Sequence, residues 1–457
     1  MTPSHNQPQD EGFSLKRGPK TFVDRRVAPT RAGLICPDTG DKAAARSAEA
    51  RLAEFEGLAR AIRLEIAFSE IVPVKMVKPA TYIGGGQVER LHDLVENDKI
   101  ELLLIDAQLS PVQQRNLERQ TGAKVLDRTA LILEIFGERA ATREGVLQVE
   151  LAHLSYQKGR LVRSWTHLER QRGAQSFIGG PGETQIEADR RLLQERILVL
   201  EKRIDKIASQ RREQRKARKA ARMPVIALVG YTNAGKSTLF NRLTSAGVVA
   251  QDQLFATLDT TARRANLPKG REVLFTDTVG FVSDLPTSLV AAFRGTLEEV
   301  TEADIVLHVR DLASPSTVAE AEDVMQILGD LGVDPATTPM IEVWNKIDLM
   351  DPERVQALRN AASGDTRIVD VSALTGEGMD TLFSAIEETL DGASRDYWMT
   401  LPVSDGRRLS WLYDHAEVIE RQNRDDGGSD LHVKVPQSEI AQFLSKFNDI
   451  SLSKTSA

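Results

Sequence analysis

The sequence has 457 residues, of which 41% are hydrophobic and 27% charged, and its formal net charge is −7. This length predicts about three domains, since domains run to roughly 100–200 residues. A membrane-spanning helix is not expected, because no apolar run approaches the ~20 residues that span a bilayer. The single cysteine, Cys36, excludes an internal disulfide framework and a cysteine metal cluster. The net negative charge of the whole chain does not indicate nucleic-acid binding.

The first twenty residues are polar and rich in proline and glutamine. Such a composition predicts a disordered tail over residues 1–20. Because the tail lacks the apolar core of a secretory signal, we expect a cytoplasmic protein.

Residues 21–144 alternate short apolar runs with amphipathic stretches, which predicts an α/β domain. The runs AGLICP, RLEIAFSEIVPV, IELLLIDA and AKVLD are expected to be strands, and residues 48–62 and 87–97 helices. Cys36 lies in the first of these runs, so we expect a buried strand thiol. The glycine-rich turn IGGGQVERL at 83–91 runs into a helix and is of a kind that can hold phosphate. It lacks the spacing of a dinucleotide fingerprint, which favours a plain loop.

Residues 145–222 are expected to form an antiparallel helical hairpin. Apolar positions step by four and three along both halves, which is typical of a coiled-coil seam. Lys158 and Arg190 put charges on these stripes. The connecting segment, RGAQSFIGGPGETQIEADRR, holds four glycines, and the second helix is expected to begin near Glu183.

The end of this second helix is strongly basic. Residues 202–222 contain ten Lys or Arg and two acids, Asp205 and Glu213. Most charge runs are solvated helix faces, but this density in an acidic protein also suits a phosphate backbone, which binds by counterion release. The sequence slightly favours a nucleic-acid contact here.

Residues 223–391 carry the chemistry. The apolar run MPVIALVG leads into GYTNAGKSTLFNRL, which fits the P-loop pattern G-x-x-x-x-G-K-[ST] between a strand and a helix. Backbone N–H groups of such a loop cradle phosphates at the positive end of the helix. Lys236 is expected to reach the β- and γ-phosphates, and the Ser237 hydroxyl to ligate Mg²⁺. The residues expected to line the nucleotide here are Gly230, Tyr231, Thr232, Asn233, Ala234, Gly235, Lys236 and Ser237.

Three further motifs follow in the order that a GTPase requires. VLFTDTVG is a strand ending at Asp277, which is expected to hold Mg²⁺ through water, while Gly280 donates its N–H to the γ-phosphate. PMIEVWNKID ends in a carboxylate, Asp348, that can accept two N–H bonds from guanine but finds no such pair on adenine. IVDVSALTGEG places backbone near guanine O6. The residues concerned are Asp277, Thr278, Val279 and Gly280, then Asn345, Lys346, Ile347 and Asp348, then Ser372, Ala373 and Leu374.

Residues 392–457 are expected to form a small α+β domain with no legible catalytic group. GRRLSWLYDHAEVIERQNR is expected to be helical, SDLHVKVP a strand and QSEIAQFLSKF a helix. The fold class is therefore α/β: a P-loop GTPase domain, preceded by an α/β domain and a helical hairpin, and followed by a small α+β domain.

The motifs GYTNAGKSTLFN, FATLD, DTVGF, NKID and SAL, together with the loop GGPGETQIEADRR, resemble the HflX family of translational GTPases. The loop makes the resemblance specific, and it covers roughly residues 25–391. It implies a Mg²⁺-dependent GTPase that binds GTP and GDP, contacts the large (50S) ribosomal subunit and its rRNA, and separates ribosomal subunits. A DNA or membrane partner is not expected, and the free chain is expected to be a monomer.

The resemblance also selects a switch threonine. On residues alone, Thr257, Thr260 and Thr261 are all candidates; the family pattern makes Thr257 the Mg²⁺ ligand beside Ser237. The segment expected at the nucleotide is Phe255, Ala256, Thr257, Leu258 and Asp259. The groups expected to act on the transferred phosphate are Lys236, Thr257 and Gly280. Two departures from the family pattern are Thr260 in place of a proline and the loop FIGGPGETQ, where many members have an arginine before the glycine-proline.

Phe281 stands where many switch GTPases have a glutamine that orients the attacking water. A phenyl ring cannot do this, so we expect slow intrinsic turnover and activation by a docked partner. Asn233 occupies a P-loop position at which asparagine recurs in potassium-dependent GTPases, so K⁺ is a candidate second cation. Asparagine is also common in tight turns, and this plainer interpretation is slightly favoured for the free protein.

Two other functions stay open at this point. One is an assembly or regulatory factor that binds GTP with negligible turnover. The other is a tRNA-modification GTPase, which needs a C-terminal cysteine that this sequence lacks.

Overall fold

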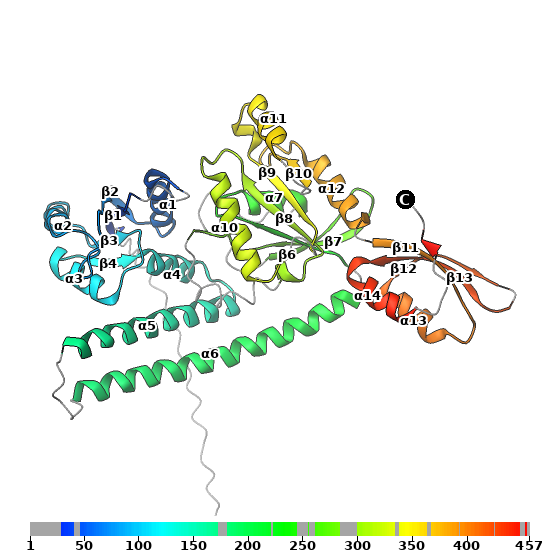
Figure 1. Cartoon of the computed structure of the whole chain (residues 1–457), viewed down its shortest axis with the longest axis horizontal. Helices are drawn as coiled ribbons and strands as arrows, with labels where there is room; N and C mark the ends of the chain where they lie inside the picture. Colours follow the sequence, from blue (N-terminus) through cyan, green and yellow to red (C-terminus); the bar gives the residue numbers. More distant parts are fainter. Residues whose placement is uncertain are drawn as a thin grey trace, which may run out of the picture.

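The computed structural model describes residues 29–40, 46–171, 181–220, 223–244, 255, 261–283, 299–333, 338–362, 367–392, 394–424, 426–447 and 453–454. These residues form three sheets and a long helical hairpin, set out along the long axis of the molecule (Figure 1). Within this described part, no helix combines the length and the apolar character that crossing a bilayer requires.

The first sheet is parallel throughout, with the strand order β2-β1-β3-β4, and helices cover both faces. Apolar residues alternate across β1, so that Ala32 and Leu34 pack with α1 and α4 while Ile35 packs with α2 and α3. The elements are β1 (Arg31–Asp38), α1 (Ala48–Ala61), β2 (Glu65–Pro73), α2 (Gly85–Asp98), β3 (Leu102–Ile105), α3 (Pro111–Thr121), β4 (Lys124–Asp127) and α4 (Arg128–Arg139). Cys36 is buried in β1, which confirms the expected strand thiol.

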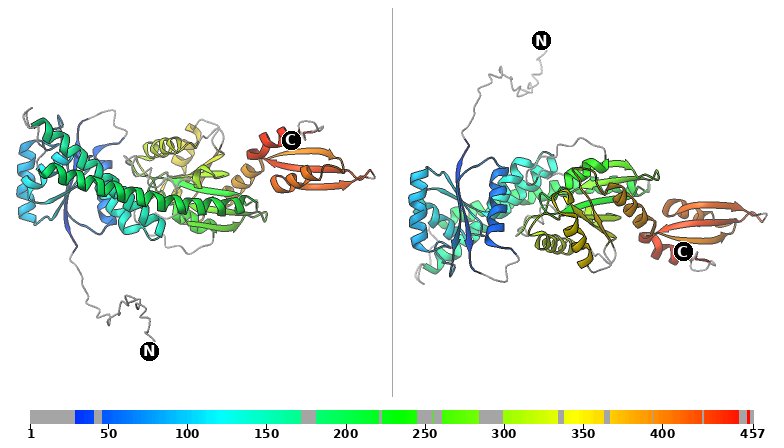
Figure 2. Two further views of the ribbon diagram at one scale, coloured as in Figure 1. Left: turned by 90° about the horizontal axis from the view of Figure 1, so that it is seen from below. Right: turned by 90° about the horizontal axis from the view of Figure 1, so that it is seen from above.

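Two long helices follow, α5 (Arg143–Gln171) and α6 (Pro181–Ala220), and they lie side by side beneath the first two sheets (Figures 1 and 2). Leu147 of α5 and Ile197 and Leu200 of α6 are buried. The charge expected on the seam, Lys158, donates to Gln194 across the pair, so its stem stays in the seam while its ammonium finds a partner. The helix α6 begins two residues before Glu183, because Pro181 suits the first turn of a helix.

The second sheet has the order β10-β9-β8-β5-β7-β6, parallel except for β6 at the edge. Its strands and helices are β5 (Val225–Gly230), α7 (Lys236–Thr244), β6 (Thr261–Asn266), β7 (Glu272–Asp277), β8 (Ile305–Asp311), α10 (Thr317–Asp330), β9 (Met340–Asn345), the 3₁₀ turn η1 (Ile347–Leu349), α11 (Pro352–Ala361), β10 (Arg367–Asp370) and α12 (Met379–Gly392). Since β5 is central, the loop that follows it lies at the carboxyl edge of the sheet, where open α/β sheets bind ligands.

The third sheet is antiparallel, with the order β12-β13-β11-β14, and its core packs under α13 and α14. Its elements are β11 (Ser394–Leu401), α13 (Gly406–His415), β12 (Glu417–Asn423), β13 (Ser429–Pro436), α14 (Gln437–Lys446) and β14 (Ser453–Lys454). The expectation of one helix through VIERQN was wrong. The helix ends at His415, and the next residues pair with β13, which packs the partly buried Val418 against the core.

Candidate functional site

The P-loop residues connect the central strand β5 to the helix α7, as the pattern predicts. Gly235 lies at φ +89°, and a Cβ there would clash with the Asn345 side-chain nitrogen. Only glycine meets both the conformation and the close approach. The loop is therefore fixed by its own backbone and by a residue more than a hundred positions further along the chain.

Lys236 opens α7 and is buried. Its Nζ donates to the carbonyl oxygens of Gly230 and Tyr231 at 3.1 and 2.9 Å. Burial lowers the pKa of this ammonium to about 8, although the carboxylate of Asp277 acts in the opposite direction. A buried cation held by neutral carbonyls is poised to exchange them for anionic phosphate oxygens.

Ser237 and Asp277 meet beneath the loop. The Ser237 hydroxyl donates to Asp277 Oδ2 at 2.8 Å, and Asp277 is buried at the end of β7. A hydroxyl and a carboxylate are hard oxygen donors of the kind that Mg²⁺ prefers. The pair thus fits a Mg²⁺ ion, which Ser237 and Asp277 would hold and which would neutralise charge on the transferred group.

The chain after Asp277 returns alongside the P-loop. Thr278 donates its hydroxyl to the carbonyl of Leu228, and Phe281 exchanges backbone hydrogen bonds with the P-loop: Phe281 N–H to Gly230 O and Thr232 N–H to Phe281 O. The Phe281 ring is 2% exposed and belongs to an apolar cluster with Val279 and Val282. Because the ring lies in this core, it is not available to orient a water molecule.

The asparagine of the base motif joins three loops. Asn345 Nδ2 donates to Ala234 O at 2.8 Å in the P-loop, and its Oδ1 accepts from the N–H of Ala373 at 2.9 Å. Asp348 lies exposed in η1, and the Ser372 hydroxyl donates to its Oδ1 at 2.6 Å. The structure therefore brings four motifs to one edge of the sheet. Counting the switch-threonine segment as the second motif, these are the P-loop (first) and residues 277–280 (third), 345–348 (fourth) and 372–374 (fifth).

Two supporting residues were not predicted from the sequence. Asp311, the last residue of β8, pairs with Lys346 Nζ at 2.7 Å. Arg242 on α7 donates to the carbonyls of Ala373 and Leu374, which fixes the last motif. A polar residue at a strand's carboxyl end is a signal that could have identified Asp311, whereas nothing local in the sequence marks Arg242.

The predicted switch residues Ala256, Thr257, Leu258 and Asp259 lie outside the residues that the structure describes. Phe255 is described: it is buried and lies edge-on to Phe136 of α4, with ring centroids 4.7 Å apart. Phe255, which was expected at the nucleotide, thus packs its ring in the apolar core beside the N-terminal domain.

A central strand, a phosphate-cradling loop with a buried lysine, a serine–aspartate pair and an exposed aspartate at the base position define a P-loop GTPase. Comparisons with known proteins support this class. Four family profiles match: GTP-binding GTPase N-terminal (residues 49–137), GTP-binding GTPase Middle Region (139–218), 50S ribosome-binding GTPase (225–346) and HflX C-terminal domain (357–454).

Among curated relatives, GTPase HflX of Magnetococcus marinus is 48% identical over 405 residues, which are 89% of this chain and 92% of that protein. GTPase HflX of Escherichia coli is 42% identical over 385 residues, 84% of this chain and 89% of that one. The chain therefore belongs to the GTPase HflX family, and it hydrolyses GTP.

Among solved structures, the SsGBP and GDP complex matches at 23% identity and a TM-score of 0.45, covering 79% of this chain and 98% of that one. A variant of Aquifex aeolicus Era bound to GDP·AlF4⁻ is 28% identical with a TM-score of 0.30, over 36% of this chain and 56% of that one.

Proposed function

We propose that this GTPase binds the large (50S) ribosomal subunit and its rRNA, hydrolyses GTP there, and separates or rescues stalled ribosomes. The description of the matching profile, a 50S ribosome-binding GTPase, supports the partner. The observation that carries the proposal is the burial of Phe281: the chain holds an intact phosphate site but places a core residue where other GTPases place the water-orienting glutamine.

The roles of the site residues form part of this proposal. Lys236 would stabilise the β- and γ-phosphates, Ser237, Thr257 and Asp277 would hold Mg²⁺, and Gly280 would donate to the γ-phosphate. Asp348 reads the guanine edge, as an acceptor for two N–H groups. The remaining nucleotide contacts come from the backbone and side chains of the P-loop, the switch segment, and the motifs that end at Asp348 and Leu374.

The direct test is GTP turnover by the purified chain with and without purified large subunits. We expect slow turnover alone and stimulation by at least about tenfold with subunits, because groups on the partner would complete the site. Small subunits at the same concentration are the control. An equal rate with and without large subunits would support the alternative function, a GTP-dependent assembly or regulatory factor with negligible turnover.

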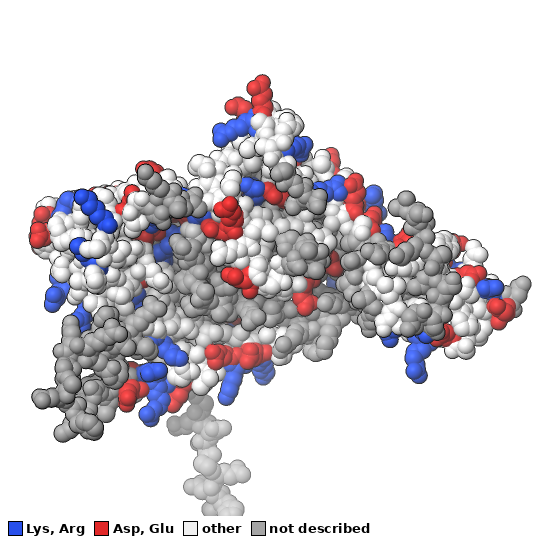
Figure 3. Space-filling view, viewed as in Figure 1, with Lys and Arg blue, Asp and Glu red and all other residues white. Residues whose placement is uncertain are grey.

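The hairpin is the proposed site of rRNA contact, through the loop at residues 177–185 and the basic segment at 202–222. On the face shown in Figure 3, positive and negative side chains are interspersed over the described part of the hairpin, so this proposal depends on the sequence of the basic segment. We expect that replacing Arg211, Arg212, Arg215, Lys216, Arg218 and Lys219 by glutamine weakens sedimentation with the large subunit and flattens its salt dependence. Unchanged sedimentation would make this segment a solvated helix face.

Potassium dependence is a separate part of the proposal. Asn233 is exposed at φ +61°, a conformation that asparagine tolerates in a turn. We expect equally low turnover in Na⁺ and K⁺ for the free chain, and higher turnover in K⁺ once large subunits are present. Asn233→Ala should remove that advantage while sparing stimulation by the subunit. Equal rates in the two salts with saturating subunits would contradict a cation role.

The proposed setting is the cytoplasm, with the free protein as a monomer. A chain of this family that acts on ribosomes meets GTP, Mg²⁺ and its partner there.

A further inference from the structure

A buried polar cluster joins the P-loop to the N-terminal domain. Its centre is the hydroxyl of Tyr231, the second residue of the P-loop pattern. This hydroxyl donates to Glu54 Oε2 of α1 at 3.0 Å and accepts from Arg46 Nη1 at 2.8 Å and from the N–H of Ser283 at 2.7 Å. One phenol therefore touches the N-terminal domain and the chain that follows the third motif.

Arg128, the first residue of α4, makes the second connection. It pairs with Glu54 and with Asp106, the latter at 2.8 Å, and donates to Ser283 Oγ at 2.7 Å and Ser283 O at 3.2 Å. Every polar group of Ser283 is thus held: its N–H by Tyr231, and its carbonyl and hydroxyl by Arg128.

This cluster is shielded from water. The side chains of Arg128, Arg46, Glu54 and Asp106 are 7%, 8%, 13% and 2% exposed. With the outer partners Arg51, which pairs with Asp106, and Asp323, which pairs with Arg46, three cations face three anions, so the charges balance. Removing one partner from such a group leaves an uncompensated buried charge. Burial lowers the pKa of Arg128, but Glu54 and Asp106 outweigh it and raise the pKa, so the guanidinium stays charged.

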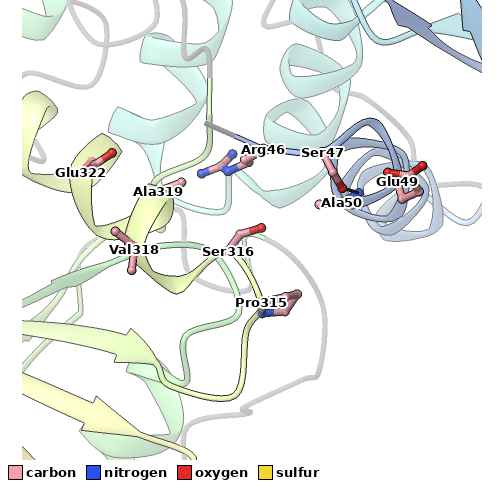
Figure 4. Close-up of a pocket in the computed structure, with 9 residues that line it drawn as sticks. All are labelled: Arg46, Ser47, Glu49, Ala50, Pro315, Ser316, Val318, Ala319 and Glu322. Carbon is pink, nitrogen blue, oxygen red and sulfur yellow. Dashed lines mark hydrogen bonds between the residues drawn. The ribbon is translucent and has the colours of Figure 1, made fainter. Parts of the chain in front are cut away.

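Arg46 closes one edge of the cluster. Its guanidinium also pairs with Asp323 of α10, and its central carbon lies 4.8 Å from the Tyr231 ring centroid. Beyond it, an open cleft of about 580 Å³ separates the start of α1 from the start of α10 (Figure 4). In Figure 4 the guanidinium points from the N-terminal domain toward α10. The residues that line this cleft, as far as the structure describes the chain, include none of the nucleotide motifs.

Apolar packing surrounds the cluster on its other sides. Phe136 of α4, Phe255 and Phe281 belong to one continuous core that runs from the first sheet into the second. The N-terminal domain is therefore docked on the P-loop, which cradles the phosphates, and on the chain that follows Gly280, a switch segment of the kind that changes contacts when a γ-phosphate binds.

We propose that Glu54 and Arg128 are positioning residues of the GTPase site, which fix Tyr231 and Ser283 so that N-terminal domain docking and the bound nucleotide are thermodynamically linked. The inference rests on the GTPase activity and not on the proposed ribosomal partner. Neither residue belongs to the nucleotide motifs, since Glu54 lies in α1 and Arg128 in α4. Each acts through a residue that borders the P-loop or the third motif.

The geometry also gives the sign of the linkage. An added Cβ on Gly280 would lie only 3.0 Å from Lys236 Nζ and from Thr232 Cγ2, so the third motif is close against the P-loop. A γ-phosphate that bonds both Lys236 and Gly280 must separate them, and Ser283 is three residues further on. GDP binding is expected to leave the intact cluster undisturbed, whereas GTP binding strains it by moving Gly280 away from Lys236. Breaking the cluster should therefore weaken the binding of GDP more than the binding of GTP.

A double-mutant cycle tests the linkage. Tyr231→Phe keeps the ring and removes the hydroxyl, and Glu54→Gln removes a charge at constant size. We expect each to speed the release of a fluorescent GDP analogue by about 5- to 20-fold, in the usual range of coupling between sites. The release of a nonhydrolysable GTP analogue should change by less than about threefold. The double variant should speed GDP release by less than the product of the two single effects, because Tyr231 and Glu54 contact each other within one cluster.

Arg160→Gln is the matched control. Arg160 also pairs with a buried carboxylate, that of Asp127, and it donates to Tyr156 and Gln114, none of which lies in the second sheet. Its GDP release should equal that of the parent chain. The proposal is overturned if Tyr231→Phe and Glu54→Gln release GDP at the parental rate, if their effects multiply in the double variant, or if both analogues are released equally faster.

Tyr231→Phe keeps this test decisive if loss of Glu54 prevents folding, since it leaves every ion pair of the N-terminal domain in place. Parental release of GDP by this single variant would by itself contradict the proposal. Arg128→Lys, which keeps the charge but loses the fork geometry, should give an intermediate rate.

Discussion

The nucleotide site and the domain interface share the P-loop, yet they are built differently. At the site, most contacts come from short motifs whose backbone makes the shape, and Asn345 joins them with two hydrogen bonds. At the interface, Glu54, Arg128, Tyr231 and Ser283 come from four separate segments and form one buried, charge-balanced cluster. The comparison teaches that the same loop is specified locally on one side and by tertiary contacts on the other.

If the site is specified locally, removing its buried cation should have the largest effect. We expect Lys236→Ala to weaken GDP binding by about 100-fold, or ~2.7 kcal/mol, the usual loss for a hydrogen bond to a charged group. A titration with a fluorescent GDP analogue measures it. Lys269→Ala, at an exposed lysine that pairs with Glu387, should leave the affinity unchanged. A change of less than about threefold for Lys236→Ala would refute the local account.

Base selectivity should depend on one exposed carboxylate. Asp348→Asn replaces an acceptor by a donor, so an unpaired polar edge should cost ~1–3 kcal/mol in GTP binding and shift the preference toward xanthosine triphosphate. Competition between the two nucleotides measures the shift. Asp351→Asn, three residues further along at the start of α11, is the control. Undiminished guanine selectivity would show that Asp348 does not read the base.

At Gly235, where the P-loop contacts Asn345, we expect the clash of an added Cβ to cost more stability than the unfavourable φ angle does. Gly235 and Gly270 have nearly equal φ angles, +89° and +87°, but only a Cβ on Gly235 meets another atom. Both alanine variants should therefore carry the conformational cost of about 1 kcal/mol, and Gly235→Ala should lose about 1–3 kcal/mol more from the clash. The comparison of their unfolding midpoints isolates the clash. Equal midpoints would mean that Asn345 moves aside freely.

The ionisation of Cys36 should make the free energy of unfolding depend on pH. The Cys36 thiol donates a hydrogen bond to Asp106, a member of the interface cluster. Burial first, then the charge of Asp106, raises the pKa of this thiol from 9.0 to about 12. The folded chain thus keeps a proton that the unfolded chain loses. The stabilising contribution is complete below pH 9 and falls between pH 9 and pH 12, by about 1 kcal/mol from pH 9 to pH 10.

Denaturant unfolding of the parent chain and of Cys36→Ala over this pH range measures that contribution as a difference between the two slopes. Since the chain has a single cysteine, no other thiol contributes. Parallel slopes would indicate a thiol that ionises as freely in the folded chain as in the unfolded one.

Much of this architecture follows from the sequence. The fold class is confirmed, since apolar runs and motif spacing mark the strands and the P-loop without any tertiary information. The one wrong element, the expected helix through VIERQN, shows the limit of periodicity. Seven residues are too few to separate a 3.6-residue repeat from a strand with a bulge, and pairing with β13 decides the outcome.

The interface could not be predicted for a related reason. Tyr231 was expected among the nucleotide contacts, as a member of the P-loop pattern. Its backbone does belong to that loop, but its hydroxyl is committed to Glu54, Arg46 and Ser283. Sequence distances of 177 and 52 residues to Glu54 and Ser283 carry no local signal. Phe281 is a similar example. The sequence shows that a phenylalanine replaces the water-orienting glutamine, but only the structure shows that its ring is buried in the core.

The most direct test of the link between site and interface needs no substitution. The Cys36 thiol donates a hydrogen bond to Asp106, which is a member of the cluster. The rate at which a thiol reagent labels Cys36 therefore reports how often the N-terminal side of the interface opens. Labelling is measured in the chain without nucleotide, with saturating GDP and with a nonhydrolysable GTP analogue. Linkage predicts slowest labelling with GDP and faster labelling with the GTP analogue. The same labelling rate in all three states would contradict it.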